Sequence, residues 1–228
     1  MRPGQHGCAV ALPSHGLSRD DAGRADRPRP RDALTGGVSP VAEALRRFLA
    51  MLAVRDARRP VLKSPPHTAR MAVLAEMFPG ARFLHIVRDP FVVFPSTKRL
   101  WESLHHVQAM QIDSGAEAEE YVFRCFDTMY AAFERDRPRL APGQLHEVRY
   151  EDLVADPVAQ MEAAYEQLGL GDFERVRPAF ETQAAAMQKY QRNRYQHDAR
   201  IVAAISQRWK PFLDRYGYTA PGAGTSAP

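Results

Sequence analysis

The sequence predicts a three-layer α/β fold in which helices flank a short parallel sheet. Two short apolar runs, "PVLKS" at 60–64 and "RFLHIV" at 82–87, have the length and composition of buried strands. About eleven helix-compatible residues and the stop signal "FPGA" separate them. A strand, a helix and a strand of these lengths are typical of a right-handed crossover between two parallel strands.

Helical patterns surround this pair of strands. Before it, "SPVAEALRRFLAMLAVRDARR" opens with Ser39 as N-cap and Pro40 in the first helical position, which predicts an amphipathic helix. Its predicted apolar face consists of Val41, Leu45, Phe48 and Leu52. After it, the pattern predicts helices at 94–106, 116–135, 151–168 and 198–215, and a third strand at 144–150. Gly169 is the expected end of the third of these helices.

The chain divides into three parts by composition. Residues 1–38 are rich in Gly, Pro, Arg and Asp and show no strand or helix period, which predicts a flexible arm. Residues 39–218 form the predicted α/β domain, and 219–228 form a disordered tail. A chain of 228 residues is long enough for one domain of this kind.

Charge, hydropathy and cysteine content narrow the function classes. The formal net charge of +4 fits an anionic small ligand as readily as nucleic acid, so charge alone does not decide the partner, and we expect a small ligand and no nucleic acid. No run of eighteen apolar residues exists, so no membrane span is expected. The two cysteines, Cys8 and Cys125, lack the spacing of a zinc site or a disulfide framework. We therefore expect no metal and a reducing, cytoplasmic setting.

Basic residues follow both predicted strands at their carboxyl ends, where parallel α/β sheets bind ligands. The first strand leads into Lys63 and His67, and the second into Arg88, with Ser96 eight residues later. An arginine at a strand end and a hydroxyl near the next helix start suit a phosphate group. Pro95 indicates that this helix begins near Phe94. The alternative is that Arg88 only pairs with a neighbouring carboxylate.

Five segments together resemble the bacterial branch of the sulfotransferase family. They are "LKSPPH", "FPGARFLHIVRDPFVVFPS", "EVRYEDLVADP", "LGL" and "RWKPFLDRYGY", in family order, over roughly 45–218. The resemblance implies a P-loop-like fold and an enzyme that transfers a sulfuryl group from 3′-phosphoadenosine 5′-phosphosulfate to a hydroxyl or amine acceptor. It implies that Arg88 and Ser96 bind the 3′-phosphate of this co-substrate.

The resemblance also suggests catalytic residues. Lys63 corresponds to a family lysine near the sulfuryl group, with a solvated or ion-paired lysine as the alternative. His67 is a candidate general base because a neutral imidazole suits that role near pH 7, and a capping or surface histidine is the alternative. Lys189, Arg192 and Arg194 match a basic loop over the nucleotide phosphate, and a solvated turn explains them equally well.

One family segment is missing from this sequence. Sulfotransferases open with a strand and a "PRSGTT"-like loop around the 5′-phosphosulfate, and no such loop occurs here. The fold is therefore expected to be incomplete at the N-terminus, with a sheet that lacks a central strand. A nucleotide-binding homologue with impaired catalysis is the alternative function. A P-loop phosphotransferase is disfavoured because GxxxxGK[ST] is absent.

Overall fold

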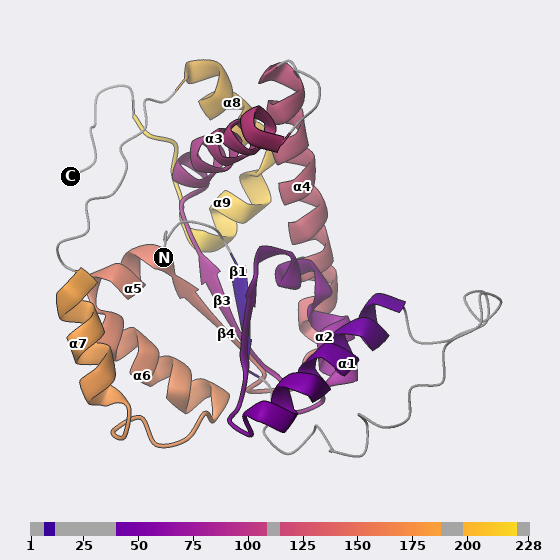
Figure 1. Cartoon of the computed structure of the whole chain (residues 1–228). Coiled ribbons are helices and arrows are strands. Elements are labelled where there is room, and N and C mark those ends of the chain that lie inside the picture. The colour runs from indigo at the N-terminus through magenta and orange to yellow at the C-terminus, as the bar shows by residue number, and fades with distance from the viewer. Residues whose placement is uncertain (1–6, 12–39, 109–114, 188–197, 223–228) are drawn as a thin grey trace.

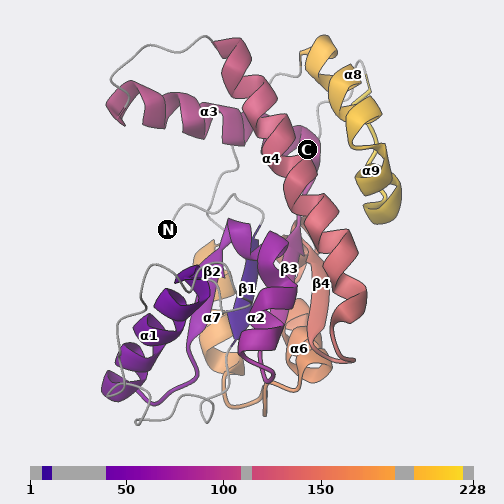
Figure 2. The ribbon, with the colours of Figure 1, turned by 90° about the vertical axis from the view of Figure 1, so that its right-hand side faces the viewer.

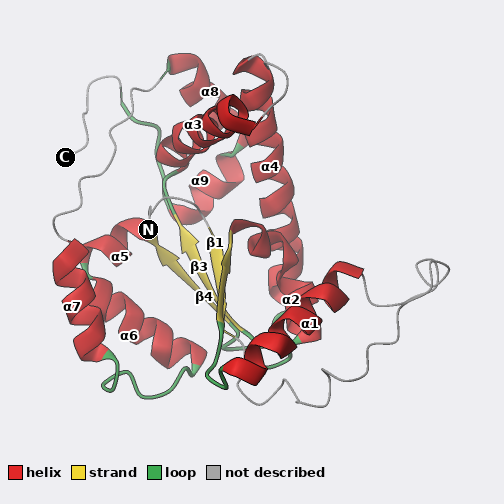
Figure 3. Cartoon of the chain, viewed as in Figure 1, coloured by secondary structure: helices red, strands yellow, loops and turns green. Residues whose placement is uncertain are grey.

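Helices cover both faces of one four-stranded sheet in the computed structural model (Figures 1 and 3). The structure describes residues 7–11, 40–108, 115–187 and 198–222. The strands are β1 (Gly7–Ala11), β2 (Val61–Ser64), β3 (Arg82–Val87) and β4 (Leu145–Arg149). Their order across the sheet is β2-β1-β3-β4. The α/β architecture predicted from the sequence is confirmed.

The helices of the described residues follow in chain order. They are α1 (Pro40–Arg55), η3 (Pro65–Arg70), α2 (Met71–Met77), α3 (Pro90–Gln108), α4 (Gly115–Asp136), η4 (Arg137–Arg139), α5 (Tyr150–Ala155), α6 (Pro157–Leu168), α7 (Arg177–Met187), α8 (Ala199–Arg208) and α9 (Lys210–Tyr216). Here η marks a 3-10 helix. Figure 1 shows α5, α6 and α7 on one side of the sheet, and α2 and α4 on the other.

The central strand β1 was not predicted. It pairs antiparallel with both β2 and β3, whereas β3 and β4 pair in parallel. Consequently β2, β3 and β4 all run in one direction, as predicted, but β2 and β3 are not neighbours.

The prediction that residues 1–38 lie outside the fold as an arm is wrong for 7–11. The expected gap in the middle of the sheet is filled by this reversed strand.

The core lies between the sheet and the long helix α4, which Figure 2 shows running along one side of the molecule. Phe83 and Val87 of β3 are fully buried there. Phe133 of α4 packs on His85, with ring centroids 4.4 Å apart. His85 is 0% exposed and therefore belongs to the core. This packing fixes β3, whose carboxyl end leads to Arg88.

Three helix boundaries differ from the prediction, and side-chain caps explain two of them. The carboxylate of Asp89 accepts a hydrogen bond from the backbone N–H of Phe91 at 2.8 Å, so α3 begins at Pro90 and not near Phe94. Pro95 therefore lies inside the helix. Asp156 caps α6 in the same way and splits the predicted helix 151–168 into α5 and α6. The last helix is interrupted at Trp209, between α8 and α9. Gly169 ends α6 with a φ of 59°, as predicted.

The predicted inner face of α1 is right for Leu45 and wrong for Phe48 and Leu52. Leu49 is buried and Leu45 packs against the core cluster. Phe48 and Leu52, which were expected to face inward, are 50% and 41% exposed. Apolar residues cover a wide arc of this helix, so its sequence period alone could not select the part of the arc that faces inward.

Candidate functional site

The candidate site lies at the carboxyl ends of β3 and β4. These strands pair in parallel with Val87 opposite Arg149, so Arg88 and Tyr150, the next residues, are neighbours. The guanidinium carbon of Arg88 lies 4.2 Å from the centroid of the Tyr150 ring. Stacking on an aromatic ring holds a guanidinium in place while leaving its N–H groups available for an anion.

Arg88 is half-buried and forms no ion pair with any carboxylate among the residues that the structure describes. The adjacent Asp89 uses its carboxylate to cap α3. The alternative in which Arg88 serves only as an ion-pair partner is therefore not observed within these residues. A half-buried cation without a carboxylate at a strand end is a suitable binding group for phosphate.

The loop that carries Arg88 is held by Glu151. One oxygen of this carboxylate accepts a hydrogen bond from the backbone N–H of Asp89 at 3.3 Å. The other accepts one from the hydroxyl of Tyr218 at 2.8 Å. Burial, followed by the hydrogen bond to Glu151, raises the pKa of Tyr218 above its ordinary value, so the hydroxyl stays protonated as a donor. Glu151, in the first turn of α5, thus links the loop after β3 to the C-terminal segment.

A second arginine at this edge contacts the C-terminal segment. The guanidinium carbon of Arg149 lies 4.7 Å from the ring centroid of Tyr218. Its Nε atom is buried and has no hydrogen-bond partner among the described residues. Arg149, Tyr150, Glu151 and Tyr218 were not predicted as site residues. The one signal was the segment "RYEDL" after a strand, which also fits an ordinary helix start.

Ser96 lies in the second turn of α3, because that helix begins earlier than predicted. It is half-buried, and about 200° of helical rotation separates it from Phe94. Phe94 packs on Phe123 and Trp209, so Ser96 lies on the side of α3 turned away from α4 and α8. Strand alternation turns Arg88 away from the face of the sheet on which Val87 is buried. The two side chains make no hydrogen bond with each other.

Lys63 lies two strands away from Arg88. Both Lys63 and Leu84 are opposite Ala9 of β1, so Lys63 is level with a residue four positions before Arg88. By strand alternation Lys63 and Arg88 share one face of the sheet. Lys63 is exposed, and no ion pair involves it among the described residues. The strands that lead to Lys63 and Arg88 are not neighbours, because β1 lies between them.

His67 lies in η3, directly after β2, and is 9% exposed. It is therefore not a surface histidine, and Ser64, not His67, is the N-cap residue of η3. The Nδ1 atom of His67 and the hydroxyl of Thr68 are both buried without a hydrogen-bond partner among the described residues. Burial first, and the charge of Arg70 second, lower the pKa of His67 from its ordinary value of 6.5. Its imidazole is thus in the neutral form that a general base requires.

Acidification is expected to destabilise the fold through His67. Because the pKa of His67 is lowered by folding, this imidazole binds a proton more readily in the unfolded chain than in the folded protein. The contribution of neutral His67 to the free energy of unfolding is therefore fully present above about pH 6.5. That contribution is lost as the pH falls through the lowered value. His67→Gln should therefore flatten the decline in urea midpoint between about pH 7 and pH 5. The exposed His106→Gln is the control, and an equal decline in wild type and H67Q would contradict this assignment.

The remaining predicted basic residues, Lys189, Arg192 and Arg194, lie outside the described residues. No cluster of metal-binding side chains occurs in the part of the chain that the structure describes. No helix among these residues is long and apolar enough to cross a membrane. The exposed Cys125 is a free thiol.

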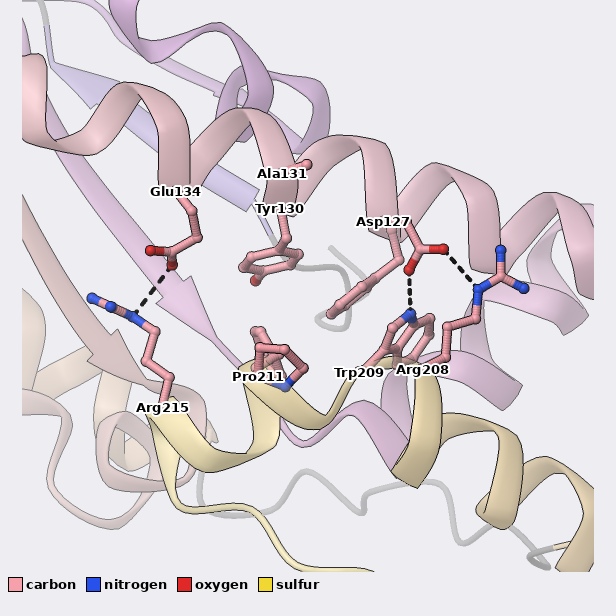
Figure 4. Close-up of a pocket in the computed structure, with 10 residues that line it drawn as sticks. Asp127, Tyr130, Ala131, Glu134, Arg208, Trp209, Pro211 and Arg215 are labelled. Atoms are coloured by element: carbon pink, nitrogen blue, oxygen red, sulfur yellow. Dashed lines mark hydrogen bonds and ion pairs between the residues drawn. The ribbon is translucent and has the colours of Figure 1, made fainter.

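A cavity of about 470 Å³ lies elsewhere, between α4 and the pair α8 and α9 (Figure 4). Its walls include Phe126, Tyr130 and Trp209, which pack on one another. Its charged groups are paired, since Asp127 accepts hydrogen bonds from Arg208 and from the Trp209 indole N–H. The cavity does not include Arg88 or Ser96. Its lining offers no unpaired charge for a phosphate.

The comparison with known proteins decides the family. The sequence profile described as "Sulfotransferase family" matches residues 18–175, which is more than half of the chain. The chain belongs to the sulfotransferase family. The family predicted from the sequence motifs is therefore confirmed.

Two curated relatives are named Omega-hydroxy-beta-dihydromenaquinone-9 sulfotransferase Stf3, from Mycobacterium bovis and Mycobacterium tuberculosis. Each is 37% identical over 172 residues, which cover 75% of this chain and 44% of the relative. The chain thus spans less than half the length of the curated relatives it matches. A solved structure, sulfotransferase STF9 from Mycobacterium avium, matches with a TM-score of 0.66 at 20% identity. That match covers 86% of this chain and 52% of the other, and it shows a shared fold.

Proposed function

We propose that this sulfotransferase family member transfers a sulfuryl group from 3′-phosphoadenosine 5′-phosphosulfate to a hydroxyl group. The observation that carries the proposal is Arg88, half-buried at the carboxyl end of β3, stacked on Tyr150 and without a carboxylate partner among the described residues. Arg88 would bind the 3′-phosphate through charge-assisted hydrogen bonds, and Ser96 would donate its hydroxyl to the same group.

The described residues fit an anionic co-substrate. Arg88 and Lys63 place two cations without a described ion-pair partner on one face of the sheet. His67 and Thr68 add buried polar atoms that lack a hydrogen-bond partner in the described structure. Such atoms are available to form hydrogen bonds with a bound ligand. Lys189, Arg192 and Arg194 remain proposed contacts to the nucleotide phosphate.

The reaction follows from the chemistry of the donor. The acceptor oxygen attacks sulfur, and the bond from sulfur to the bridging oxygen of the 5′-phosphate breaks. The bridging oxygen keeps the electron pair as adenosine 3′,5′-bisphosphate departs. We propose that His67 takes the acceptor proton and that Lys63 stabilises the charge that develops on the leaving phosphate. Positioning and electrostatics would supply most of the rate.

A hydroxyl is the proposed acceptor because the two curated relatives are named for an omega-hydroxy compound. The sequence motifs alone left a hydroxyl or an amine open. For this chain we propose a hydroxyl acceptor but not the particular compound in the relatives' name, because the chain spans only part of those relatives.

The orientation of β1 favours a second candidate, a protein that binds the nucleotide without transferring the sulfuryl group. Ala11, the last residue of β1, lies opposite Arg82, the first residue of β3. Strand β1 therefore ends at the edge of the sheet away from Arg88 and does not lead into a loop for the 5′-phosphosulfate at the candidate site. The 3′-phosphate end of the nucleotide could then be held without productive orientation of sulfur.

Transfer of ³⁵S from labelled donor to a panel of alcohols and amines distinguishes the two candidates. The enzyme hypothesis predicts labelled alcohol products, and His67→Gln should lower kcat while leaving the affinity for adenosine 3′,5′-bisphosphate unchanged. Labelled products with amines only would contradict the acceptor assignment. Bisphosphate binding without any labelled product would support the second candidate.

A further inference from the structure

The outward face of α1 is apolar, which is unusual for a surface helix of a globular protein. Phe48, Met51 and Leu52 are 50%, 60% and 41% exposed. Their spacing of three and four residues places them in one stripe along the helix. Leu49, about 100° further around the helix than Phe48, is buried, and Leu45 lies between these two and packs against the core cluster. Phe48, Met51 and Leu52 are not part of that cluster, so the stripe borders the packed face of α1.

The apolar surface continues beyond the helix onto the adjacent edge of the sheet. Val54 at the end of α1 is 54% exposed, and Val61 of β2 is 68% exposed. β2 is an outer strand of the four-stranded sheet. Figure 2 shows α1 and β2 together at one side of the molecule. We call Phe48, Met51, Leu52, Val54 and Val61 the α1 apolar surface.

Arginines border the α1 apolar surface. Arg55, Arg58 and Arg59 are exposed. Arg58 is paired with Asp56, whereas Arg55 and Arg59 form no ion pair among the described residues. Residues 40–61 contain five arginines, one glutamate and one aspartate, so they carry +3 of the formal +4 of the whole chain. The positive charge is thus concentrated where the apolar side chains are exposed.

From this combination we propose that the α1 apolar surface docks on an anionic lipid bilayer. Helices that lie in the bilayer interface bury apolar side chains at the boundary between headgroups and acyl chains, while arginines contact lipid phosphates. Arginine also suits this position because its apolar stem can be buried while the guanidinium stays at the phosphates.

A second copy of the chain fits this surface less well. A two-fold symmetric contact would bring Arg55 and Arg59 of one copy close to the same residues of the other. Like charges in an interface disfavour association, whereas anionic headgroups neutralise them. The proposal does not depend on sulfuryl transfer, because it rests on residues remote in sequence from Arg88 and Ser96.

Co-sedimentation of the full chain with vesicles tests the proposal. Vesicles of phosphatidylcholine with phosphatidylglycerol should bind the wild type at least tenfold more strongly than vesicles of phosphatidylcholine alone. The triple variant Phe48→Ser, Met51→Ser, Leu52→Ser should lose at least tenfold in partition to the mixed vesicles. The double variant Arg55→Glu, Arg59→Glu should lose the preference for anionic lipid.

Matched controls exist on α3. Val107→Ser changes an apolar residue that is 81% exposed, and Arg99→Glu reverses the charge of an exposed arginine. Both should bind vesicles like the wild type, and circular dichroism should show all variants folded. Equal binding of the wild type and the triple variant would overturn the proposal. A second outcome would also overturn it: the wild type does not bind vesicles and is a dimer by light scattering, whereas the triple variant is a monomer.

Discussion

Replacing Arg88 with alanine is expected to weaken the binding of adenosine 3′,5′-bisphosphate by about 30-fold or more. The estimate corresponds to ~2 kcal/mol for charge-assisted hydrogen bonds between a guanidinium and a phosphate. The large effect follows from the position of Arg88, which is half-buried beside Tyr150 and has no carboxylate to occupy it among the described residues. Titration calorimetry of both proteins measures the difference.

Two further variants make the Arg88 experiment specific. Arg88→Lys keeps the charge but loses the planar fork, so its affinity should fall between those of the wild type and R88A. Arg99→Ala removes an exposed arginine of α3 and should leave the affinity unchanged. If R88A and R99A bind the bisphosphate equally well, Arg88 is not part of the site.

Replacing Trp209 with alanine should cause the largest loss of stability that we predict, about 3–5 kcal/mol in the free energy of unfolding. Trp209 is 3% exposed and stacks on Phe126 with ring centroids 3.9 Å apart. Its indole N–H donates a hydrogen bond to Asp127 at 2.8 Å (Figure 4). The ring also contacts Phe94, so its removal loosens the contact between α3, α4 and the C-terminal helices.

Urea unfolding of two variants separates the parts of this effect. Trp209→Phe keeps an aromatic ring and leaves Asp127 bonded to Arg208, so it should cost less than W209A. Val107→Ala, on the exposed end of α3, should change stability by less than about 0.5 kcal/mol. A loss of similar size for V107A and W209A would contradict the assignment of Trp209 to the core.

Strand β3 and its basic end could be predicted because the mostly apolar segment "RFLHIV" followed by "RDP" is a local signal. The start of α3 was predicted from Pro95 alone, and the cap by Asp89 places it earlier. Strand β1 could not be predicted, since "GCAVA" is short and its pairing with β2 and β3 depends on residues far along the chain. That missed strand also explains why Lys63 lies farther from Arg88 than expected.

The side chains around Arg88 illustrate the same limit. Arg88 itself follows from the motif, whereas Tyr150, Glu151 and Tyr218 act through contacts that join β4 and the C-terminal segment to the loop after β3. Such contacts leave no periodic pattern in one sequence. The exposed residues of α1 are a related case, because a wide apolar arc does not define which part of a helix faces the core.

Calorimetry with adenosine 3′,5′-bisphosphate and with 5′-AMP tests the central claim most directly, since the two ligands differ only in the 3′-phosphate that Arg88 and Ser96 are proposed to bind. We expect the bisphosphate to bind at least tenfold more tightly, as one or more charge-assisted hydrogen bonds would provide. Equal affinities for the two nucleotides would contradict the assignment of this edge of the sheet as the 3′-phosphate site.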